Sequence, residues 1–212
     1  VHDYKNESEW RTESFMSKAF LSHSIELNKI DYRKILKSSD SLELKNQINN
    51  KIQDCDLVFL QRGEGVSPEI FSDIRIPILF WSTEPINRNK DVDILLESNI
   101  FDWVYMHTHS CIDRLKREFP HLVKKSSVLH NAVCEQKINL LNNKKKYFAI
   151  FNRSLSFRRR YWLFYSRKLI KFIKGRYGDL YFQDLRDSYI SVNVHYSRKS
   201  IDDFETGIFE AL

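Results

Sequence analysis

The chain has 212 residues, of which 42% are hydrophobic and 14% aromatic, and it carries a formal net charge of +6. This apolar content is ample for a buried core and argues against an intrinsically disordered chain. No apolar run approaches the roughly 18 residues that a membrane-spanning helix needs. The positive charge favours an anionic partner, such as nucleic acid, an anionic membrane or a phosphorylated ligand, although an AT-rich genome would raise the lysine content in the same way.

The three cysteines are scattered along the chain, at Cys55, Cys111 and Cys134. None of them stands in a CxxC or Cys/His spacing that would indicate a metal site. No signal peptide is recognisable, and an odd number of scattered cysteines is typical of a reduced protein. We therefore expect a cytoplasmic protein without a structural metal.

In chain order, the spacing of apolar residues predicts a helix over 9–21, a strand within "SIELNKIDYR" (24–33) and a helix over 42–52. Four apolar runs of buried-strand type follow, each closed by polar residues: "CDLVFLQRG", "IPILFWSTEP", "FDWVYMHTH" and "SSVLHNAV". Short helices are predicted between them, over 67–72 and 110–119. This alternation predicts a parallel sheet with helices on both faces, in which ligands bind beyond the carboxyl ends of the strands.

A change of composition marks a second α/β part. The polar segment 136–146 predicts a linker, which separates domains at 1–135 and 147–212. The second domain is expected to contain the strand "KYFAIFN", a long aromatic helix over 158–174, a turn-rich passage over 175–185 and the strand "YISVNVH". Aromatic residues occur around much of the predicted helix, which indicates a buried helix rather than a nucleic-acid or membrane surface.

Three polar residues at strand ends of the first domain are candidate site residues. Glu84 precedes Pro85, which holds its backbone extended. A carboxylate there can act as a general base or orient a sugar hydroxyl, and an exposed loop acid is the alternative. His107 and His109 would share one face of a strand, but metal binding needs a third ligand of clear spacing, so a hydrogen-bonding role is expected for one of them.

The segment "FNRSLSFRRR" links a predicted strand to a predicted helix, with Ser156 as the candidate N-cap. Arginines are unfavourable at a helix N-terminus unless an anion neutralises them. The segment therefore predicts a phosphate- or diphosphate-binding turn that uses Asn152, Arg153 and Arg158, and a solvated basic face is the alternative. Neither GxGxxG nor GxxxxGK[ST] is present, so neither a dinucleotide fingerprint nor a P-loop is supported.

The last predicted strand leads to His195, and segment 204–212 predicts the start of a helix that contains Glu210. A carboxylate at such a place can accept hydrogen bonds from both hydroxyls of a ribose. Taken alone, a glutamate near a helix start is more typical of a capping or dipole partner. His195 alone is compatible with either an interior or a ligand-contacting histidine.

The order of "DLVFLQRG", "IPILFWSTEP", "FDWVYMHTH", "VLHNAV", "YFAIFNRSLSFRRR", "YISVNVH" and "GIFEAL" resembles that of the spore-maturation CgeB-type glycosyltransferases and the related group-1 family with a GT-B fold. The resemblance runs from about Asp31 to the end. In that family, "LN-hydrophobic-H" precedes a loop and "R-x-F-E-A-L"; here Val192–His195 and Gly207–Leu212 stand at those positions, with glycine in place of the arginine. The family continues with a glycine-containing turn and further helices, so the second domain is expected to be incomplete.

The resemblance implies two Rossmann-like domains that face a cleft, as in GT-B enzymes. It implies a metal-independent glycosyltransferase of the hexosyltransferase type, which moves a sugar from a nucleotide-diphosphate-sugar donor to a glycan, protein or small-molecule acceptor. No cofactor besides the donor is expected. Arginines and helix N-termini would stabilise the departing diphosphate.

The family's site residues carry over to matching positions of this chain. The glutamate of the terminal motif would contact the ribose, the basic turn would lie near the diphosphate, and the glutamate of "FWSTEP" would point to the acceptor side. The residues predicted to carry catalysis are Glu84, His107 and His195, and those predicted to bind the donor are Asn152, Arg153, Arg158 and Glu210.

Three alternatives remain open. The first is a non-catalytic nucleotide- or glycan-binding module of the same fold, which the glycine at position 207 favours. The second is a nucleic-acid-binding protein, favoured only by the net charge and the run Arg158–Arg160, and no nucleic-acid motif supports it. The third is a sugar-nucleotide epimerase. Nucleic acid is therefore not an expected partner, and a peripheral contact with a membrane stays open.

Overall fold

The computed structural model describes residues 12–86, 90–131, 144–174 and 178–194. The chain divides into two compact units, one formed by Ile25–Asn131 and the other by Val1–Ser24 together with Ala132–Leu212. Each unit is described by itself. Within the described residues, no helix is both long enough and apolar enough to cross a membrane.

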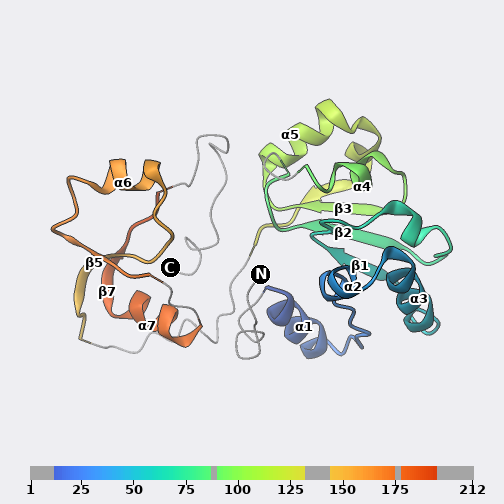
Figure 1. The fold of residues 1–212 in the computed structure, drawn as a ribbon, viewed down its shortest axis with the longest axis horizontal. Coiled ribbons are helices and arrows are strands. Elements are labelled where there is room, and N and C mark those ends of the chain that lie inside the picture. Colours follow the sequence, from blue (N-terminus) through green and yellow to red (C-terminus); the bar gives the residue numbers. More distant parts are fainter. Residues whose placement is uncertain (1–11, 87–89, 132–143, 175–177, 195–212) are drawn as a thin grey trace. The chain divides into compact units, whose positions relative to one another are not determined.

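The unit Ile25–Asn131 is built on a four-stranded parallel sheet in the order β1-β2-β3-β4 (Figure 1). Each strand lies within one of the four predicted apolar runs. The strands are β1 (Val58–Gln61), β2 (Ile78–Ser82), β3 (Trp103–Met106) and β4 (Ser126–Val128), and the helices are α2 (Tyr32–Ser38), α3 (Ser41–Lys51), α4 (Asp93–Glu97) and α5 (His109–Glu118), with 3-10 helices at Pro68–Phe71 and Pro120–Lys125.

A large apolar core holds this unit together. Phe80 and Val104, at the middle of adjacent strands, are fully buried and stand in register with each other. Phe80 also stacks on Phe101, with ring centroids 4.9 Å apart. Burial of side chains of this size is the main stabilising contribution to such a fold, about 1.5–3 kcal/mol for each large apolar side chain.

The strand predicted within 24–33 is wrong, because this segment leads into helix α2. The Asp31 side chain accepts a hydrogen bond from the backbone N–H of Lys34, 3.1 Å away, and caps the helix. Tyr32, Ile35 and Leu36 then pack against the core at helical spacing. The spacing of the apolar residues therefore becomes helical at the cap. The prediction of a single strand did not take this change into account.

The second unit contains α1 (Thr12–Ser22) and a three-stranded parallel sheet in the order β6-β5-β7. Figure 1 shows α6 on one side of these strands and α7 on the other. The elements of this sheet are β5 (Tyr147–Phe151), α6 (Phe157–Leu163), β6 (Ile170–Phe172), α7 (Asp179–Arg186) and β7 (Ser188–Ser191). The two parallel sheets with their helices make the protein an α/β protein compatible with Rossmann-like folds.

Two predictions for this unit are wrong. The helix predicted over 158–174 ends at Leu163, because residues 170–172 form β6, in which Ile170 stands in register with Ala149 of β5. The passage predicted as turn-rich over 175–185 contains helix α7, which buries Phe182. In both places tertiary pairing decides the structure against the local pattern.

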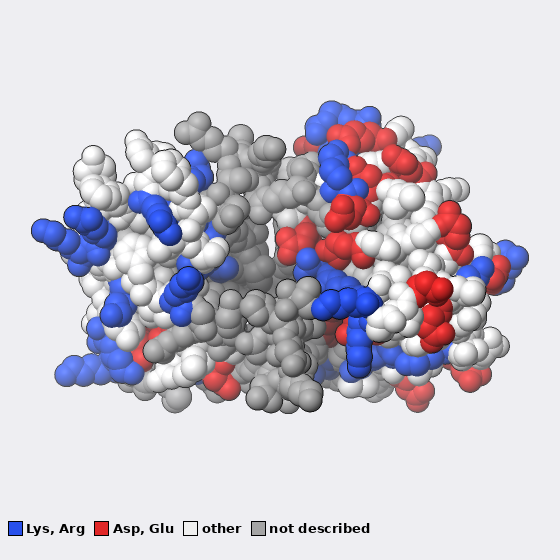
Figure 2. Space-filling view, viewed as in Figure 1, with Lys and Arg blue, Asp and Glu red and all other residues white. Residues whose placement is uncertain are grey.

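The prediction that the aromatic residues of the long helix are buried is wrong for Tyr161, Trp162, Phe164 and Tyr165, which are exposed, whereas Phe172 is half-buried and packs against the core of this unit. Leu163 and Ile170 pack into the small core of this unit, which also contains Ala149 and Phe151. The aromatic side chains from Phe157 to Tyr165 are more than half exposed. Figure 2 shows that lysine and arginine side chains far outnumber acidic ones on the visible face of the elements β5 to β7.

Candidate functional site

The sheet topology locates a candidate ligand site in the second unit. In the first sheet, every strand lies beside its neighbour in sequence, so all crossovers run in one direction. In the sheet β6-β5-β7, the chain leaves β5 toward one side and returns to its other side. The strand order thus reverses between β5 and β7. At such a reversal the loops that follow adjacent strands diverge, and α/β proteins hold their ligands there.

Asn152 and Asn193 face this reversal from the two adjacent strands. Ile150 and Ser191 form the last register pair between β5 and β7, and the two asparagines each stand two residues beyond it. The Nδ2 atom of Asn152 and the Oδ1 atom of Asn193 are buried and have no hydrogen-bond partner within the described residues. Because buried polar atoms are normally paired, a donor and an acceptor are available here to a polar ligand.

Arg159 joins the two loops that border the reversal. Its Nε atom donates a hydrogen bond to the carbonyl oxygen of Val194, 2.6 Å away, and its Nη1 atom donates to the carbonyl oxygen of Ser154 at 3.0 Å. The side chain is 4% exposed, and its guanidinium lies over the Phe151 ring. These donors are engaged within the protein, so Arg159 positions the loops and is not itself available to a ligand.

The predicted phosphate-binding arginines differ in their surroundings. Arg153 donates from Nη2 to the hydroxyl of Tyr181 in α7, 3.3 Å away. The Nε atom of Arg158 is buried without a hydrogen-bond partner in the described part of the chain, and its guanidinium lies 5.9 Å from the centroid of the Trp162 ring. The basic turn therefore brings a further unpaired donor to the unit that contains the strand reversal.

Two predicted residues of this unit, His195 and Glu210, lie outside the described residues. Their predicted roles, as a catalytic group near the donor and as the ribose contact, stay predictions.

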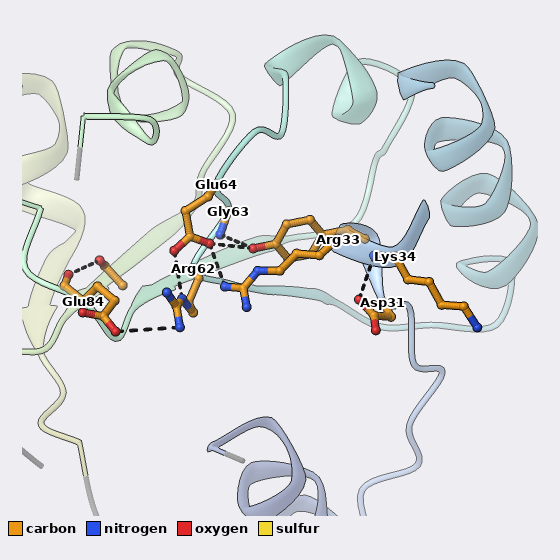
Figure 3. A network of polar contacts seen from close by, with 9 residues as sticks. Asp31, Arg33, Lys34, Arg62, Gly63, Glu64 and Glu84 are labelled. Carbon is orange, nitrogen blue, oxygen red and sulfur yellow. Dashed lines mark hydrogen bonds and ion pairs between the residues drawn. The ribbon is translucent and has the colours of Figure 1, made fainter. Parts of the chain in front are cut away.

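The loop after β1 in the first unit contains an ionic cluster (Figure 3). Arg62 and Gly63 both have positive φ angles, of 74° and 82°, and turn the chain sharply. This turn allows the Arg62 Nε atom to donate to Glu64 Oε1 at 2.8 Å. The other carboxylate oxygen accepts from Arg33 Nη2 at 2.8 Å and from the Tyr32 hydroxyl at 3.0 Å. The cluster thus connects α2 to the loop after β1.

The charges of this cluster are strongly coupled. Burial acts to raise the pKa of Glu64, but hydrogen bonds from Arg33 and Arg62 outweigh it and lower this pKa to about 2. Burial, with the neighbouring charge of Glu64, raises the pKa of Tyr32. Glu64 is therefore a fixed anion at neutral pH, suited to hold the loop and unsuited to proton transfer.

Glu84, the predicted general base, lies after β2 next to this cluster. The Ser82 hydroxyl donates to the Glu84 carbonyl oxygen at 2.7 Å and holds the turn. The Glu84 carboxylate is 49% exposed, and its Oε1 atom lies 3.7 Å from Arg62 Nη1. Arg62 thus bridges Glu64 and Glu84, as Figure 3 shows. The exposed carboxylate retains acceptor capacity for a substrate hydroxyl.

The histidines after β3 and β4 are placed differently. His107, predicted to be catalytic, is 4% exposed, and its Nδ1 atom lies 3.8 Å from the Cys111 sulfur. His109 and His130 are exposed, with ring centroids 6.1 Å apart, and His130 Nδ1 hydrogen-bonds the His107 carbonyl oxygen at 2.8 Å. The imidazoles that a ligand can reach at this edge are therefore those of His109 and His130.

Within the described ranges, no group of three or more His, Cys, Asp or Glu residues could hold a metal ion. Cys55 and Cys111 are free thiols, and Cys134 lies outside the described residues.

Sequence reasoning missed Glu64 and Asn193. The contacts of Glu64 come from Tyr32 and Arg33, which are remote in sequence and had been assigned to a strand. Asn193 had a usable signal, because it follows the strand segment "YISV" just as Asn152 follows "YFAIF". Polar amides after two adjacent parallel strands point to the same edge of a sheet.

Comparison of the chain with models of protein families, with curated proteins and with solved structures finds no match.

Proposed function

We propose that the protein is a glycosyltransferase that moves a sugar from a nucleotide-diphosphate-sugar donor to a hydroxyl-bearing acceptor. In this proposal the two α/β units are the Rossmann-like domains of a GT-B enzyme. The unit containing β5 to β7 binds the donor, and the unit Ile25–Asn131 binds the acceptor. The observation that carries the proposal is the strand reversal between β5 and β7, which is flanked by unpaired polar atoms and a basic turn.

The available groups match the parts of such a donor. The Nδ2 atom of Asn152 and the Nε atom of Arg158 are donors, and a diphosphate offers only acceptors. The Oδ1 atom of Asn193 is an acceptor and suits a sugar or ribose hydroxyl. Arg153 adds positive charge that would stabilise the departing diphosphate. His195 and Glu210 would complete the donor site as the catalytic and ribose contacts.

Glu84 would act on the acceptor. In the transfer, the bond between the anomeric carbon and the diphosphate oxygen breaks, and the acceptor oxygen forms the new bond. Glu84 would orient the acceptor hydroxyl or take its proton, while the ion pair with Arg62 would hold the carboxylate in position. Any catalytic contribution of His107 would require its side chain to leave its buried position.

The donor site can be tested with a matched pair of variants, Arg158→Gln and Arg160→Gln. Both remove one positive charge from neighbouring positions of α6, but only Arg158 has a buried, unpaired Nε atom, and Arg160 is exposed. Calorimetry against a panel of nucleoside diphosphates and their sugars should find a ligand whose affinity falls tenfold or more in R158Q and less than twofold in R160Q. A folded protein that binds none of the panel would contradict the proposal.

The second candidate function is a non-catalytic nucleotide- or glycan-binding module of the same fold. The burial of His107 and the ion pair of Glu84 with Arg62 favour it, because both reduce the groups available for proton transfer. Product analysis with the bound nucleotide sugar separates the two functions. Sugar transfer or donor hydrolysis that drops in Glu84→Gln supports the enzyme, whereas donor binding without any turnover supports the binding module.

A further inference from the structure

An exposed surface of the second unit combines large aromatic side chains with cations. We call it the aromatic-basic patch. Tyr165 is 90% exposed and Phe157 88% exposed, values that are high for side chains of this size. Several large apolar side chains exposed on one short segment are typical of an interaction site. The patch consists of Phe157, Arg160, Tyr161, Trp162, Phe164, Tyr165, Arg167, Lys168 and Leu169, all exposed.

The patch belongs to a segment without negative charge. No aspartate or glutamate occurs between Glu135 and Asp179, whereas lysine and arginine recur throughout this interval. By contrast, acidic and basic residues are mixed over the elements of the unit Ile25–Asn131, as Figure 2 shows. The positive charge of the protein is therefore concentrated around the exposed aromatic rings. A partner for this surface must be apolar and anionic at once.

The side chains of the patch support one another. The Arg167 guanidinium lies 4.6 Å from the centroid of the Phe164 ring. Tyr161 packs edge-to-face on Trp162 at 5.7 Å, and Phe164 packs likewise on Tyr165 at 5.4 Å. The rings thus form two compact pairs with cations beside them. Proteins that bind single-stranded nucleic acid instead present separate flat rings along a groove, on which the bases stack.

We propose that the aromatic-basic patch docks the protein on the surface of a membrane that contains anionic lipid. Tyrosine and tryptophan rings prefer the level of the lipid headgroups, where one end meets hydrocarbon and the other meets water. Arginine and lysine beside them reach anionic headgroups while their aliphatic stems stay with the apolar rings. Leu163 of α6 is buried in the core of the unit and holds this helix on the sheet.

The size of the effect can be tested by vesicle co-sedimentation of the full chain. Vesicles of equal parts phosphatidylcholine and phosphatidylglycerol should bind the protein, and vesicles of phosphatidylcholine alone should bind it at least tenfold more weakly. Each cation near such a surface contributes about fivefold to partitioning, so the double variant R167Q/K168Q should lose about 25-fold. Salt at about 1 M should abolish most of the binding, because charges are then screened within about 3 Å.

Matched variants distinguish the contribution of the aromatic-basic patch to vesicle binding from the effect of net charge alone. K34Q/K37Q removes two exposed lysines of α2 in the unit Ile25–Asn131 and should change partitioning less than twofold. W162S/Y165S should lower partitioning about tenfold or more, whereas W162F/Y165F should retain most of it because the apolar rings remain. Circular dichroism verifies that each variant is folded.

Several outcomes would overturn the proposal. Equal losses in K34Q/K37Q and R167Q/K168Q would show that only net charge matters. Binding of a single-stranded oligonucleotide, but not of vesicles, that is lost in W162S/Y165S would assign the patch to nucleic acid. Self-association in sedimentation equilibrium that is lost in W162S/Y165S, again without vesicle binding, would assign the patch to a second copy of the chain.

Discussion

Arg159 and Val194 are joined by a hydrogen bond of 2.6 Å from Nε to the backbone carbonyl oxygen, and this bond ties the loop after β5 to the segment after β7. The same guanidinium donates to Ser154 in the first of these loops. The strand reversal therefore does not depend on β5–β7 pairing alone. A buried arginine sets the distance between the two sides of the candidate donor site, which keeps the asparagines beyond the strands in place.

Arg159→Met should loosen this junction. The substitution removes a buried cation that donates hydrogen bonds to Val194 and Ser154, and both backbone carbonyl oxygens lose this donor, which costs about 2–4 kcal/mol. Hydrogen exchange of the β5 and β7 amides should become faster by about 30-fold to 900-fold, which is this free-energy loss at 1.36 kcal/mol for each factor of ten. Arg160→Met, at an exposed neighbouring position, is the control and should change exchange little. Equal protection in the two variants would show that the Arg159 contacts are not stabilising.

Glu64 should make the free energy of unfolding of its unit depend on pH. Its pKa is about 2 in the folded protein against an ordinary value of 4.5, so the folded state favours the ionised form. A lowered pKa stabilises the fold above the ordinary value, and this contribution is lost as the pH falls from about 4.5 to 2. After allowance for partial exposure, we expect about 1–2 kcal/mol.

The variant Glu64→Gln tests this dependence in urea unfolding monitored between pH 7 and pH 2. The wild type should be more stable than E64Q at pH 7, and the difference should shrink to nearly zero at the acid end. Glu97→Gln, an exposed carboxylate in α4, is the matched control and should follow the wild type. A difference between wild type and E64Q that stays constant down to pH 2 would contradict the lowered pKa.

Replacement of Gly63 by alanine should destabilise the protein more than the same replacement of Gly65, two positions later. A Cβ atom at Gly63 would lie 2.8 Å from Leu95 Cδ1 and 3.3 Å from Phe80 Cε2. At Gly65 the nearest atom would be 4.0 Å away, and the φ angles of the two glycines are similar, 82° and 74°. Gly65→Ala therefore includes backbone strain of about 1 kcal/mol, while Gly63→Ala adds about 1–3 kcal/mol for the clash with the core. Thermal unfolding of both variants should give this order, and equal losses would exclude the clash.

The first sheet could be predicted from the sequence because each of its strands coincides with a short apolar run. Such a run can be buried on both faces, and the polar residues that close it mark its end. Sheet β6-β5-β7 was harder to predict from the sequence. Strand β6 has only three residues, and its pairing with β5 defines it, so the local spacing favoured an uninterrupted helix over 158–174. Long-range pairing leaves no local signal when the strand is this short.

The candidate site was predictable to a similar extent. The rule that ligands lie beyond the carboxyl ends of parallel strands led to Glu84 and Asn152, both of which lie there. Burial could not be predicted, because whether His107 or His109 turns inward depends on packing by α5. The partners of Glu64 could not be predicted either, because Tyr32 and Arg33 reach it only through the folded arrangement of α2 and β1.

Arg114 should be the most sensitive charged residue of the unit Ile25–Asn131 outside the candidate site. It is 1% exposed, yet its guanidinium donates to Asp93 at 2.7 Å, to Glu118 at 2.8 Å and to the Ile86 carbonyl oxygen. Burial acts to lower the pKa of Arg114, but the hydrogen bonds that it donates to Asp93 and Glu118 outweigh burial and raise this pKa. The residue thus connects α5 to α4 and to the loop after β2.

Arg114→Met keeps most of the side-chain volume and removes all of these bonds. Because Asp93 and Glu118 retain contact with water, the expected loss is about 2–4 kcal/mol, below that of a fully buried pair. Arg117→Met, three residues along the same helix and exposed, should change the free energy of unfolding by less than about 0.5 kcal/mol. Urea unfolding of the two variants measures the difference. A loss in R114M no larger than in R117M would mean that the desolvation of Arg114 cancels the stabilisation by its partners.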